Sequence, residues 1–552
     1  MRVHFGSHTN PDQLWRDIIA NHPKIVAVDC ETPSLKNREM LGTGIAVSPD
    51  DGFYVSEDEP DFYELMALLQ DKDVCKVYHN ALYDIRVLRP WGIDYTNTDD
   101  TAIMCRLMGK TGVLEENSQD VKTQSRNAGE VMAQHGVTTM DRLPDGEVAL
   151  KCIEDCLATI QLYYKYKDQV PQQVYNLDRA VIPILEQVSQ NGIGVDEERH
   201  QILTEHYQRE YDYYKVIGDS MGFDPSKRFE VGFMLSEAGE FLPTTKKGQM
   251  LLTDETTLRG VKSPTAIPIA QMVLLFRKAQ KMLGTYLRPL SGKDRAYTML
   301  HMEAVTGRIN GTNAGQNNPD RNILNFPKKA DMKQPKHMQY RSIFVPYEYD
   351  DFTDSDASQI ELRVLAFVSG DERMQQVFNS GGDIHLDTAR GLWPDRPEAM
   401  REFAKVFNYA VSYNGDARTV AAGIESNDFN MVAAMMEKWH TTYPEASKWI
   451  QGQKEDGIRN GYVETTRGRK MWLPTDRGEK HAINCAINWP IQAEAAEIFK
   501  LAILECKELA NQCRVYMHDG KLYEGQVDIP DLTDISPIHV PWDIEVKKRW
   551  SG

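Results

Sequence analysis

The order of apolar and polar positions divides the chain into three regions, of which residues 1–170 form the first. Short apolar runs in this region alternate with stretches whose apolar residues recur at helical spacing. This pattern predicts a sheet packed against helices, and the region is therefore expected to be an α/β domain. The predicted strands are IVAVDCETPSL (25–35), GTGIAVSP (42–49) and GFYVSE (52–57), and the predicted helix is FYELMALLQ (62–70).

From residue 171 to about residue 290 the apolar spacing is helical. The segment NLDRAVIPILEQVSQNG (176–192) ends at Gly192, which favours a helix stop there. A second long helical stretch is expected over IPIAQMVLLFRKAQKMLGTYLRPL (267–290). After residue 291 strands and helices mix, as in an α+β domain. Two helices are predicted there, AMREFAKVFNYAVSY (399–413) and WPIQAEAAEIFKLAILECKELA (489–510).

The composition is that of a globular protein with a large core. The chain has 552 residues, of which 41% are apolar and 26% charged, and this length allows two to four domains. The sequence lacks an apolar run of the roughly 18 residues that a membrane span needs, and its start lacks the apolar core of a secretory signal. The eight cysteines are scattered, with Cys152 and Cys156 the only close pair. We therefore expect a cytoplasmic protein with reduced thiols.

The net charge of −18 argues against nucleic acid as a partner, but two local runs are basic. Phosphate binding depends on local Lys and Arg rather than on the net charge. The two runs are residues 321–341, with Lys328, Lys329, Lys333 and Lys336, and residues 465–481. Either run alone could be a solvated surface. Together they predict a basic cleft in an otherwise acidic protein.

Two separated aspartates are candidates for a metal site. Asp356 begins DASQIELR (356–363), which is predicted to be a strand entering a helix, and Asp519 follows the apolar VYM (515–517). Transfer of a nucleotide to a hydroxyl is served by two divalent ions about 3.5–4 Å apart, held by hard oxygen ligands. A single Asp in a turn is more often a helix cap or a solvated residue. The occurrence of each aspartate in its own motif favours the metal site.

A basic and aromatic stripe lies between the two aspartates. Arg401, Lys405, Tyr409 and Tyr413 recur every four residues, and such steps drift only about 40° around a helix. Two cations at one end could bind a triphosphate, while the aromatic rings stack on a base. The alternative is an amphipathic helix with aromatic residues in the core and solvated cations.

These three elements resemble motifs A, B and C of the family A DNA polymerases, the group of bacterial DNA polymerase I. Further segments with the same resemblance cover nearly all of residues 290–552. They are VTGRINGTN (305–313), NILNFP (322–327), GDIHLDTAR (382–390), GYVETTRGRKMWLP (461–474), INWPIQAEAAEIFK (487–500) and VPWDIEVKKRW (540–550).

The resemblance implies a right-hand polymerase domain that follows an amino-terminal domain. Its thumb and beginning would be residues 171–290, and its palm residues 291–552 with the fingers inserted at about 371–480. Two Mg²⁺ ions, replaceable by Mn²⁺, would be held by Asp356 and Asp519. The implied dNTP-binding residues are Arg401, Lys405, Tyr409, Tyr413, Glu361, His385 and Gln359. The implied DNA-binding residues are Arg308, Asn325, Asn488, Gln492 and His518.

The resemblance also assigns a specific role to Glu361 and shows two departures. Glu361 would block the 2′-hydroxyl of a ribonucleotide by its bulk. Gly520 stands where the family usually has Glu in motif C, and Asn484 where it often has Arg. The Gly520 departure affects the geometry of the second metal, and the Asn484 departure weakens one DNA contact.

A second acidic set lies in the amino-terminal region. Asp29 and Glu31 are two residues apart in a predicted strand, so their side chains point to the same face. With Asp84 and Asp155 they resemble the four acids of the 3′–5′ exonucleases that accompany family A polymerases. The resemblance implies an RNase H-like domain with two further metal ions. Lys151 stands where that family commonly has Tyr, so metal binding is expected more firmly than full proofreading speed. The alternative is a structural remnant.

The function that we expect is DNA-dependent DNA synthesis with proofreading, with primer-template DNA and dNTPs as partners. A single-subunit RNA polymerase is an alternative, against which Glu361 argues. A 3′–5′ exonuclease whose palm only binds DNA is another. The compact chain without a 5′-nuclease domain is more typical of a phage replicative enzyme, acting as a monomer in the host cytoplasm. The thumb region looks too short for a thioredoxin-type processivity factor, and no membrane is expected as a partner.

Overall fold

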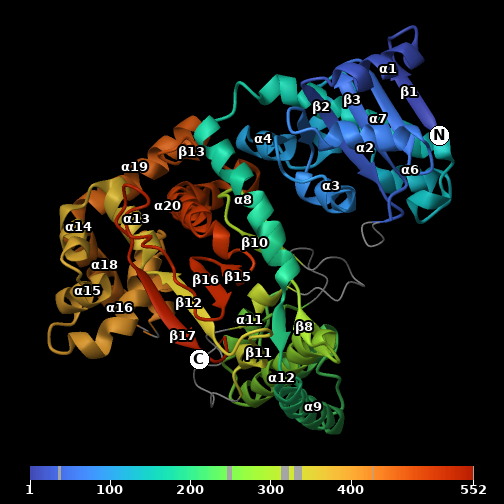
Figure 1. The fold of residues 1–552 in the computed structure, drawn as a ribbon. Coiled ribbons are helices and arrows are strands. Elements are labelled where there is room, and N and C mark those ends of the chain that lie inside the picture. The colour runs from blue at the N-terminus through green and yellow to red at the C-terminus, as the bar shows by residue number, and fades with distance from the viewer. Residues whose placement is uncertain are drawn as a thin grey trace.

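The computed structural model describes residues 1–34, 39–244, 251–312, 322–327, 338–424, 426 and 428–550. Most of the predicted basic run 321–341, including Lys328, Lys329, Lys333 and Lys336, lies outside these residues. In Figure 1 the six-stranded sheet lies at the upper right, and helices α14, α15, α16 and α18 lie on the opposite side of the molecule. None of the described helices combines the length and hydrophobicity that a membrane span requires.

The amino-terminal region is a mixed six-stranded sheet with helices on both faces. β2 pairs antiparallel with β3 and parallel with β5. Side chains alternate between the faces, so Val26 and Val28 pack with α1, α2 and α3, while Ala27 packs with α4 and α7. In sheet order the strands are β1 (Arg2–Gly6), β4 (Asp51–Ser56), β3 (Gly42–Ser48), β2 (Ile25–Glu31), β5 (Cys75–Tyr78) and β6 (Thr98–Asp100). The helices are α1 (Pro11–Asn21), α2 (Asp61–Gln70), α3 (Ala81–Leu88), α4 (Thr101–Leu107), α5 (Leu114–Asn117), α6 (Ala128–Gln134) and α7 (Asp145–Tyr166).

The α/β prediction for this region is confirmed, with one difference in length. The predicted strand 25–35 ends at Glu31, because Pro33 has no N–H to donate to a neighbouring strand. α7 packs against β2, β3 and β4, and so brings its buried face to the strand that carries Asp29 and Glu31.

Helix α8 (Gln172–Asn191) leads from the first sheet into the rest of the chain and ends where the sequence predicts. Its cap, Gly192, has φ 62°. A Cβ at Gly192 would lie 2.9 Å from the carbonyl oxygen of Ala296, so both the backbone angle and the space require glycine.

The second region is helical, and one of its predicted helices changes form before it ends. α12 is α-helical only to Lys281, a six-residue π-helical turn (Met282–Leu287) follows, and Arg288–Leu290 is 3₁₀. The α-helix cannot continue to residue 290, because Pro289 has no N–H and Gly284 is a poor helix former. The helices are α9 (Glu197–Ser220), α10 (Arg228–Glu237), α11 (Glu255–Arg259) and α12 (Ala266–Lys281), with α9 packed against α12.

The third region is built on an antiparallel sheet of four strands. β12 (Phe352–Ala357) lies between β16 (Gly520–Glu524) and β17 (Trp542–Lys547), and β15 (Cys513–Met517) completes the sheet beside β16. The mixed α+β prediction is thereby confirmed. Two smaller sheets are β11 (Phe344–Val345), β7 (Ile193–Val195) and β8 (Arg295–Ala296), and β10 (Asn310–Thr312) with β9 (Met299–His301).

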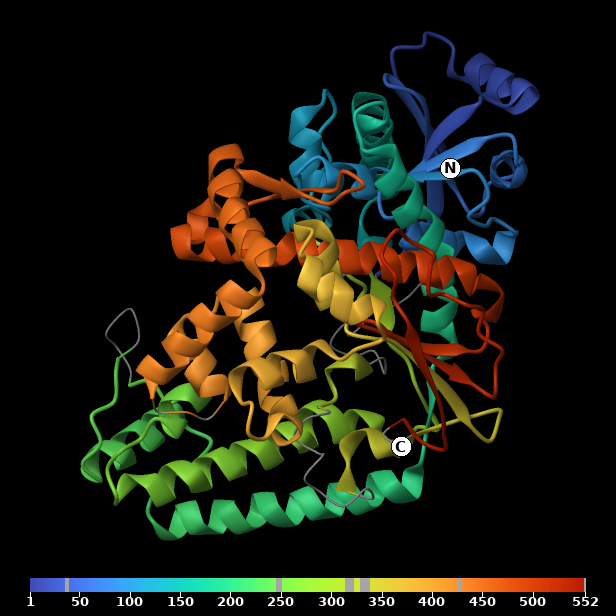
Figure 2. The same cartoon turned by 90° about the vertical axis from the view of Figure 1, so that its left-hand side faces the viewer.

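Helices surround this sheet, and one hydrophobic cluster joins α13 and the helices that follow to α20. In Figure 2 α20 crosses the molecule between the six-stranded sheet above and the helices of the second region below. α20 begins ten residues before the predicted 489 and keeps its form through Pro490. The helices are α13 (Ile360–Ser369), α14 (Glu372–Asn379), α15 (Ile384–Leu392), α16 (Pro397–Ser412), α17 (Ala417–Gly423), α18 (Phe429–Thr442), α19 (Pro444–Asn460) and α20 (Glu479–Glu505). A hairpin of β13 (Tyr462–Glu464) and β14 (Lys470–Trp472) precedes α20.

Candidate active sites

The four-stranded sheet brings Asp356 and Asp519 together. Asp356 is near the end of β12 and pairs in register with Gly520, while Asp519 lies in the turn between β15 and β16. The N–H of Ala357 donates to the carbonyl oxygen of Asp519 at 3.0 Å. His518 takes the left-handed conformation in this turn, with φ 58°. The predicted meeting of the two aspartates is therefore found.

Gly520 leaves room for the Asp356 carboxylate. A Cβ at residue 520 would lie 2.9 Å from Oδ1 of Asp356, which is closer than side-chain carbons normally approach. The departure from the family pattern at this position therefore has a direct steric effect on Asp356. A side chain at residue 520 would require the Asp356 carboxylate to shift from this position.

The electrostatics of the pair suit a divalent cation. Burial, followed by the Asp356 charge, raises the pKa of Asp519 to about 7. Two carboxylates this close favour protonation of one of them unless a cation lies between them. Asp519 forms no ion pair with any residue that the structure describes. Hard carboxylate oxygens are also the ligands that Mg²⁺ and Mn²⁺ prefer, so the donor set fits such an ion.

Glu361 lies in the first turn of α13 and is held from two sides. Arg308 and the hydroxyl of Tyr413 both donate to its carboxylate. Burial, followed by this carboxylate, raises the pKa of Tyr413. Gln359 precedes the helix at φ 53°, and its Oε1 is buried without a hydrogen-bond partner among the described residues. The structure thus gathers a predicted DNA-binding residue and predicted dNTP-binding residues around one carboxylate.

The predicted basic and aromatic stripe lies on α16, with one correction. The helix ends at Ser412, so Tyr413 is the first residue after it rather than part of it. The ring centroids of Tyr409 and Tyr413 are 6.3 Å apart. Burial, followed by the charges of Glu361, Asp519 and Asp356, raises the pKa of Tyr409. The aromatic end of the stripe therefore faces the acidic pair.

At the other end of the stripe, Arg401 is already paired with an acid. Its Nε and Nη2 contact Asp383 at 2.7 and 2.6 Å, and Nη1 contacts Glu402. Lys405 is exposed and makes no ion pair within the described part of the chain. The sequence interpretation did not single out Asp383, although an Asp directly before a predicted helix is a signal for a cap. Asp383 does cap α15, accepting from the N–H groups of His385 and Leu386.

His385 is buried beneath the stripe and is neutral near pH 7. The amide Nδ2 of Asn408 donates to Nδ1 of His385 at 3.1 Å, and Nε2 of His385 has no hydrogen-bond partner among the described residues. Burial is the main cause that lowers the pKa of His385 to about 4. Its ring centroid lies 5.8 Å from that of Tyr409. The neutral ring therefore leaves Nε2 free to form a hydrogen bond with a ligand beside the stripe.

The remaining predicted DNA-binding residues are spread along one side of these elements. Asn488 and Gln492 are one turn apart on α20, and Oδ1 of Asn488 is buried without a described partner. Asn325 is exposed at the end of a short 3₁₀ turn. His518 is exposed as well, in the turn between β15 and β16.

Three arginines of the two predicted basic runs are held within the fold, whereas Lys470, Arg477 and Lys480 are exposed. Arg341 is buried and donates to the carbonyl oxygen of Phe326 at 3.0 Å. In the run 465–481, Arg467 pairs with Glu494 at 3.0 Å, and Arg469 is buried in an ion network. Carboxylates that lie far away in the sequence neutralise Arg467 and Arg469, so these two side chains stabilise the fold.

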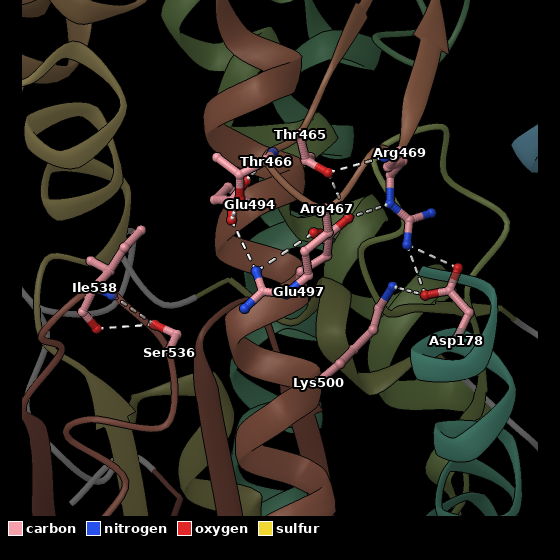
Figure 3. A network of polar contacts seen from close by, with 10 residues as sticks. All are labelled: Asp178, Thr465, Thr466, Arg467, Arg469, Glu494, Glu497, Lys500, Ser536 and Ile538. Atoms are coloured by element: carbon pink, nitrogen blue, oxygen red, sulfur yellow. Dashed lines mark hydrogen bonds and ion pairs between the residues drawn. The ribbon is translucent and has the colours of Figure 1, made fainter. Parts of the chain in front are cut away.

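The ion network around Arg469 joins three parts of the chain (Figure 3). Arg469, in the β13–β14 hairpin, contacts Asp178 of α8 at 2.8 and 2.9 Å and Glu497 of α20 at 2.9 Å. Lys500 of α20 donates to the same aspartate at 2.6 Å. Burial lowers the pKa of Lys500 to about 8 against the opposing effect of Asp178. The network fixes α8 to α20 and to the hairpin, and we call it the Asp178 network.

The second acidic site lies between the six-stranded sheet and α7. Asp29 and Glu31 are on β2, Asp84 is on α3 and Asp155 is on α7, so the structure brings together all four predicted acids. The Asp84 carboxylate accepts from the N–H of Cys30 at 3.0 Å. Glu31, Asp84 and Asp155 are each less than one-tenth exposed. We call these four residues the amino-terminal acid cluster.

Lys151 contacts this cluster directly. Its ammonium Nζ lies 2.5 Å from Oδ2 of Asp155 and 3.5 Å from Oε1 of Glu31. Cys152, which the sequence interpretation left out, lies beside it with Sγ 3.4 Å from Oδ2 of Asp29. Ligand atoms of Asp29, Glu31 and Cys152 all lie within 4.8 Å of one another. The sequence singled out Cys152 only by its close spacing to Cys156, although it also lies one turn before Asp155.

Burial is the largest influence on the pKa values of Asp29, Glu31 and Asp84 in this cluster. Burial, followed by the neighbouring carboxylates, raises the pKa of Asp29 well above its usual range, and burial also raises that of Asp84. Burial raises the pKa of Glu31 to about 7 against the opposing effect of Lys151. Burial opposes the charge on Lys151, but Glu31 and Asp155 outweigh it and raise the pKa of the ammonium.

Comparison with known proteins defines the class to which these two sites belong. The family described as "DNA polymerase family A" matches residues 195–523, and the family described as "3'-5' exonuclease" matches residues 12–171. The chain belongs to DNA polymerase family A, with a 3′–5′ exonuclease domain preceding the polymerase domain. The fold class expected from the sequence is confirmed.

Individual relatives agree with this assignment. The chain is 27% identical over 547 residues to "DNA polymerase I, thermostable" of Thermus thermophilus, covering 90% of this chain and 62% of the relative. It is 27% identical over 557 residues to "DNA polymerase I" of Chloroflexus aurantiacus, covering 91% of this chain and 57% of that relative. The chain therefore spans less than two thirds of these relatives' length.

A solved structure matches the fold over almost the whole chain. It is described as "POL domain of Pol1 from M. smegmatis complex with DNA primer-template and dNTP". The TM-score is 0.76 at 20% identity, and the match covers 98% of each chain. At this identity the likeness concerns the fold.

Proposed function

We propose that the chain carries out template-directed DNA synthesis, in which a nucleotide is transferred from a dNTP to the 3′-hydroxyl of a primer. The observation that carries this proposal is the meeting of Asp356 and Asp519 at the end of the four-stranded sheet, faced by Tyr409 of α16. The M. smegmatis neighbour is described with DNA primer-template and dNTP. We extend both partners to this chain.

Asp356 and Asp519 would hold Mg²⁺ ions, with Mn²⁺ as a substitute. When bound, such ions activate the primer hydroxyl and neutralise the charge of the triphosphate. The exposed Lys405 would bind the triphosphate, and Arg401 would join it by exchanging Asp383 for a phosphate oxygen, since the two anions compete for one guanidinium. His385 would donate from Nε2 as a neutral group, because burial keeps the ring uncharged.

The sugar and base of the nucleotide would lie against the aromatic end of the stripe. Tyr409 would pack against the base, and Glu361 would occupy the space next to the ribose 2′ position. Arg308 and Tyr413 hold the Glu361 carboxylate in place, so its bulk is fixed rather than mobile. The buried Oε1 of Gln359 is available to the same ligand. Contacts to the DNA would come from Arg308, Asn325, Asn488, Gln492 and His518.

We propose 3′–5′ hydrolysis of DNA ends as the activity of the amino-terminal domain. The four acids of the amino-terminal acid cluster support it, because carboxylates gathered on one face of a sheet are suited to hold metal ions. Replacing Asp29 and Glu31 together by Ala should then remove any 3′ digestion while primer extension continues. Digestion by that double variant would assign the activity elsewhere.

The biological setting remains a prediction from the sequence. The relatives reported above are bacterial enzymes, whereas the sequence suggests replication of a phage genome. Action as a monomer, without a thioredoxin-type processivity factor, is likewise predicted. The eight cysteines are free thiols, which agrees with the reducing cytoplasm in which we place the protein.

Primer extension by single variants tests the polymerase proposal. We expect Asp356→Asn and Asp519→Asn each to reduce extension roughly a thousandfold or more while leaving primer-template binding intact, because each removes a ligand that positions charge stabilisation. Asp354→Asn is the matched control, since Asp354 lies on the same strand but pairs with Lys547 at 2.7 Å. Extension by either site variant at the control's rate would overturn the assignment. Digestion without any extension by the unmodified chain would favour the exonuclease-only alternative.

A further inference from the structure

The amino-terminal acid cluster already contains a cation that belongs to the protein. Four acids converge where burial makes their charges unfavourable. Buried carboxylates require a cation or a proton close by. A metal-dependent hydrolase would be expected to leave that place to a divalent ion. In this chain an ammonium from α7 points into it.

The position of the ammonium is specific. Lys151 is 6% exposed, and its Nζ lies 2.5 Å from Asp155 and 3.5 Å from Glu31. It therefore bridges acids from two different elements, α7 and β2. A divalent ion shared by those two carboxylates would need the same volume. The residues present consequently do not fit a bridging metal between Glu31 and Asp155 while Lys151 stays in place.

We propose that the Lys151 ammonium is an internal substitute for a divalent cation between Glu31 and Asp155, and that a metal ion can bind there only by displacing it. The inference rests on the proposed exonuclease function and specifies how that site is regulated. The Glu31 and Asp155 half of the cluster is then charge-compensated without metal. Metal binding must then compete with a tethered ion whose effective concentration is high.

Two further observations agree with this assignment. Oδ1 of Asp155, the oxygen not used by Lys151, is buried and has no hydrogen-bond partner among the described residues. The other end of the cluster, where Asp29 lies beside Cys152, has no ammonium contact of this kind in the described structure. Lys151 thus compensates one half of the cluster, and the Asp29 half keeps its carboxylate and thiol.

The test is Mn²⁺ binding to the full chain with the polymerase site removed by Asp356→Asn and Asp519→Asn. In this background we compare the Mn²⁺ affinity of the protein that retains Lys151 with that of two variants. They are Lys151→Met, whose side chain has a similar length without the charge, and Lys151→Tyr. We expect each variant to bind Mn²⁺ roughly a hundredfold more tightly than the Lys151 protein, because a unit charge within 4 Å no longer repels the ion. Lys151→Arg, which retains the charge, should bind as weakly as Lys151.

Thermal unfolding gives a second measurement. Lys151→Met should unfold at a lower temperature than the Lys151 protein in a chelator and recover by about 5 °C in excess Mn²⁺, because an ion that binds only the folded state stabilises it. The matched control is Lys76→Met, which removes another buried ammonium of the same domain, one that donates to the carbonyl oxygen of Asp71 at 3.2 Å. Its unfolding temperature should fall without recovery in Mn²⁺.

The outcomes separate this inference from the proposed function. Equal Mn²⁺ affinity of the Lys151 protein and both neutral variants would overturn the inference, whether or not the chain digests DNA ends. A gain of Mn²⁺ binding in Lys151→Tyr without 3′ digestion would support it and would argue against the proposed exonuclease activity. Should Lys151→Met fail to fold, the Lys151→Tyr titration decides alone.

Discussion

The two acidic sites of this chain differ in what balances their charge. In the amino-terminal acid cluster, three of the four carboxylates are almost fully buried, and the Lys151 ammonium contacts two of these, Asp155 at 2.5 Å and Glu31 at 3.5 Å. In the polymerase domain, Asp356 is exposed, and Asp519 has its pKa raised to about 7 with no described ion-pair partner. Carboxylates alone therefore do not define a metal site. The cation that the fold already supplies decides whether a metal is required.

Removal of divalent ions by a chelator should show the largest difference between the two acidic sites. We expect a chelator to abolish primer extension, because Asp356 and Asp519 then repel each other across the place where the ion belongs. The unfolding temperature of the exonuclease domain should stay within about 1 °C, because Lys151 already balances Glu31 and Asp155 without a metal ion. Extension and differential scanning calorimetry on the same sample measure both. A fall in the unfolding temperature on chelation would contradict the comparison.

Lys500 of the Asp178 network provides a reference for how much a buried lysine contributes to the stability of the fold when it has no role at a metal site. Lys500→Met would remove one of the two cations that contact Asp178, Arg469 being the other, so the expected loss is at most about 3–5 kcal/mol, the loss typical of a broken buried ion pair. We expect Lys500→Met to show a loss up to this size, with no recovery in Mn²⁺. Arg477→Met, on an exposed residue of the neighbouring basic run, should change stability by less than about 0.5 kcal/mol. Thermal unfolding of both variants measures the difference, and equal stability would contradict the role of the network.

Within the polymerase site, Glu361 is an acid for which we propose a steric role rather than metal binding. Glu361→Ala should raise the use of ribonucleotides relative to deoxyribonucleotides by roughly tenfold or more, since truncation removes a clash worth at least about 1.4 kcal/mol. Competition between the two nucleotide types on one template measures the ratio. Glu372→Ala, on an exposed residue of α14, is the control. A ratio that stays unchanged in Glu361→Ala would exclude the steric role.

The smallest expected effect concerns a single hydroxyl. A dideoxynucleotide lacks the 3′-hydroxyl, and the Tyr409 hydroxyl can fill the polar position that this leaves. Tyr409→Phe should therefore discriminate against dideoxynucleotides about tenfold more than the unmodified chain, because an unpaired buried polar group costs about 1–3 kcal/mol. Competition of dideoxy- and deoxynucleotides gives the ratio directly. Equal discrimination by the two proteins would place Tyr409 outside the nucleotide pocket.

Sequence predicted those features that depend on local patterns. The spacing of Asp29 and Glu31 on one strand, and the four-residue steps of the stripe from Arg401, follow from the geometry of a strand and of a helix. The pairing of Lys151 with Asp155 was also within reach, because the two residues are one turn apart on α7. Its second contact, with Glu31, depends on how α7 packs on β2, and no local pattern encodes that.

Other features could not be predicted because their partners are distant in the sequence. The basic run 465–481 suggested a phosphate-binding face, yet Arg469 pairs with Asp178 of α8, which lies 291 residues earlier in the chain. Asp383 was not recognised as the partner of Arg401, since the pairing requires α15 and α16 to pack side by side. Charge counts along a sequence overestimate the free cations of a surface wherever buried acids neutralise them.

The position of Asp178 also determines where the molecule can be cut. α8 follows directly after the exonuclease domain, but its aspartate neutralises Arg469 and Lys500 of the polymerase domain. A polymerase fragment should therefore begin before Gln172, because one that begins after Asn191 would leave the buried Lys500 without Asp178 and Arg469 with Glu497 alone. Limited proteolysis ought to find the viable junction on the amino-terminal side of α8. Separation there would still uncover Trp472, whose indole lies directly over Gly109, so the isolated fragment would gain an exposed apolar surface.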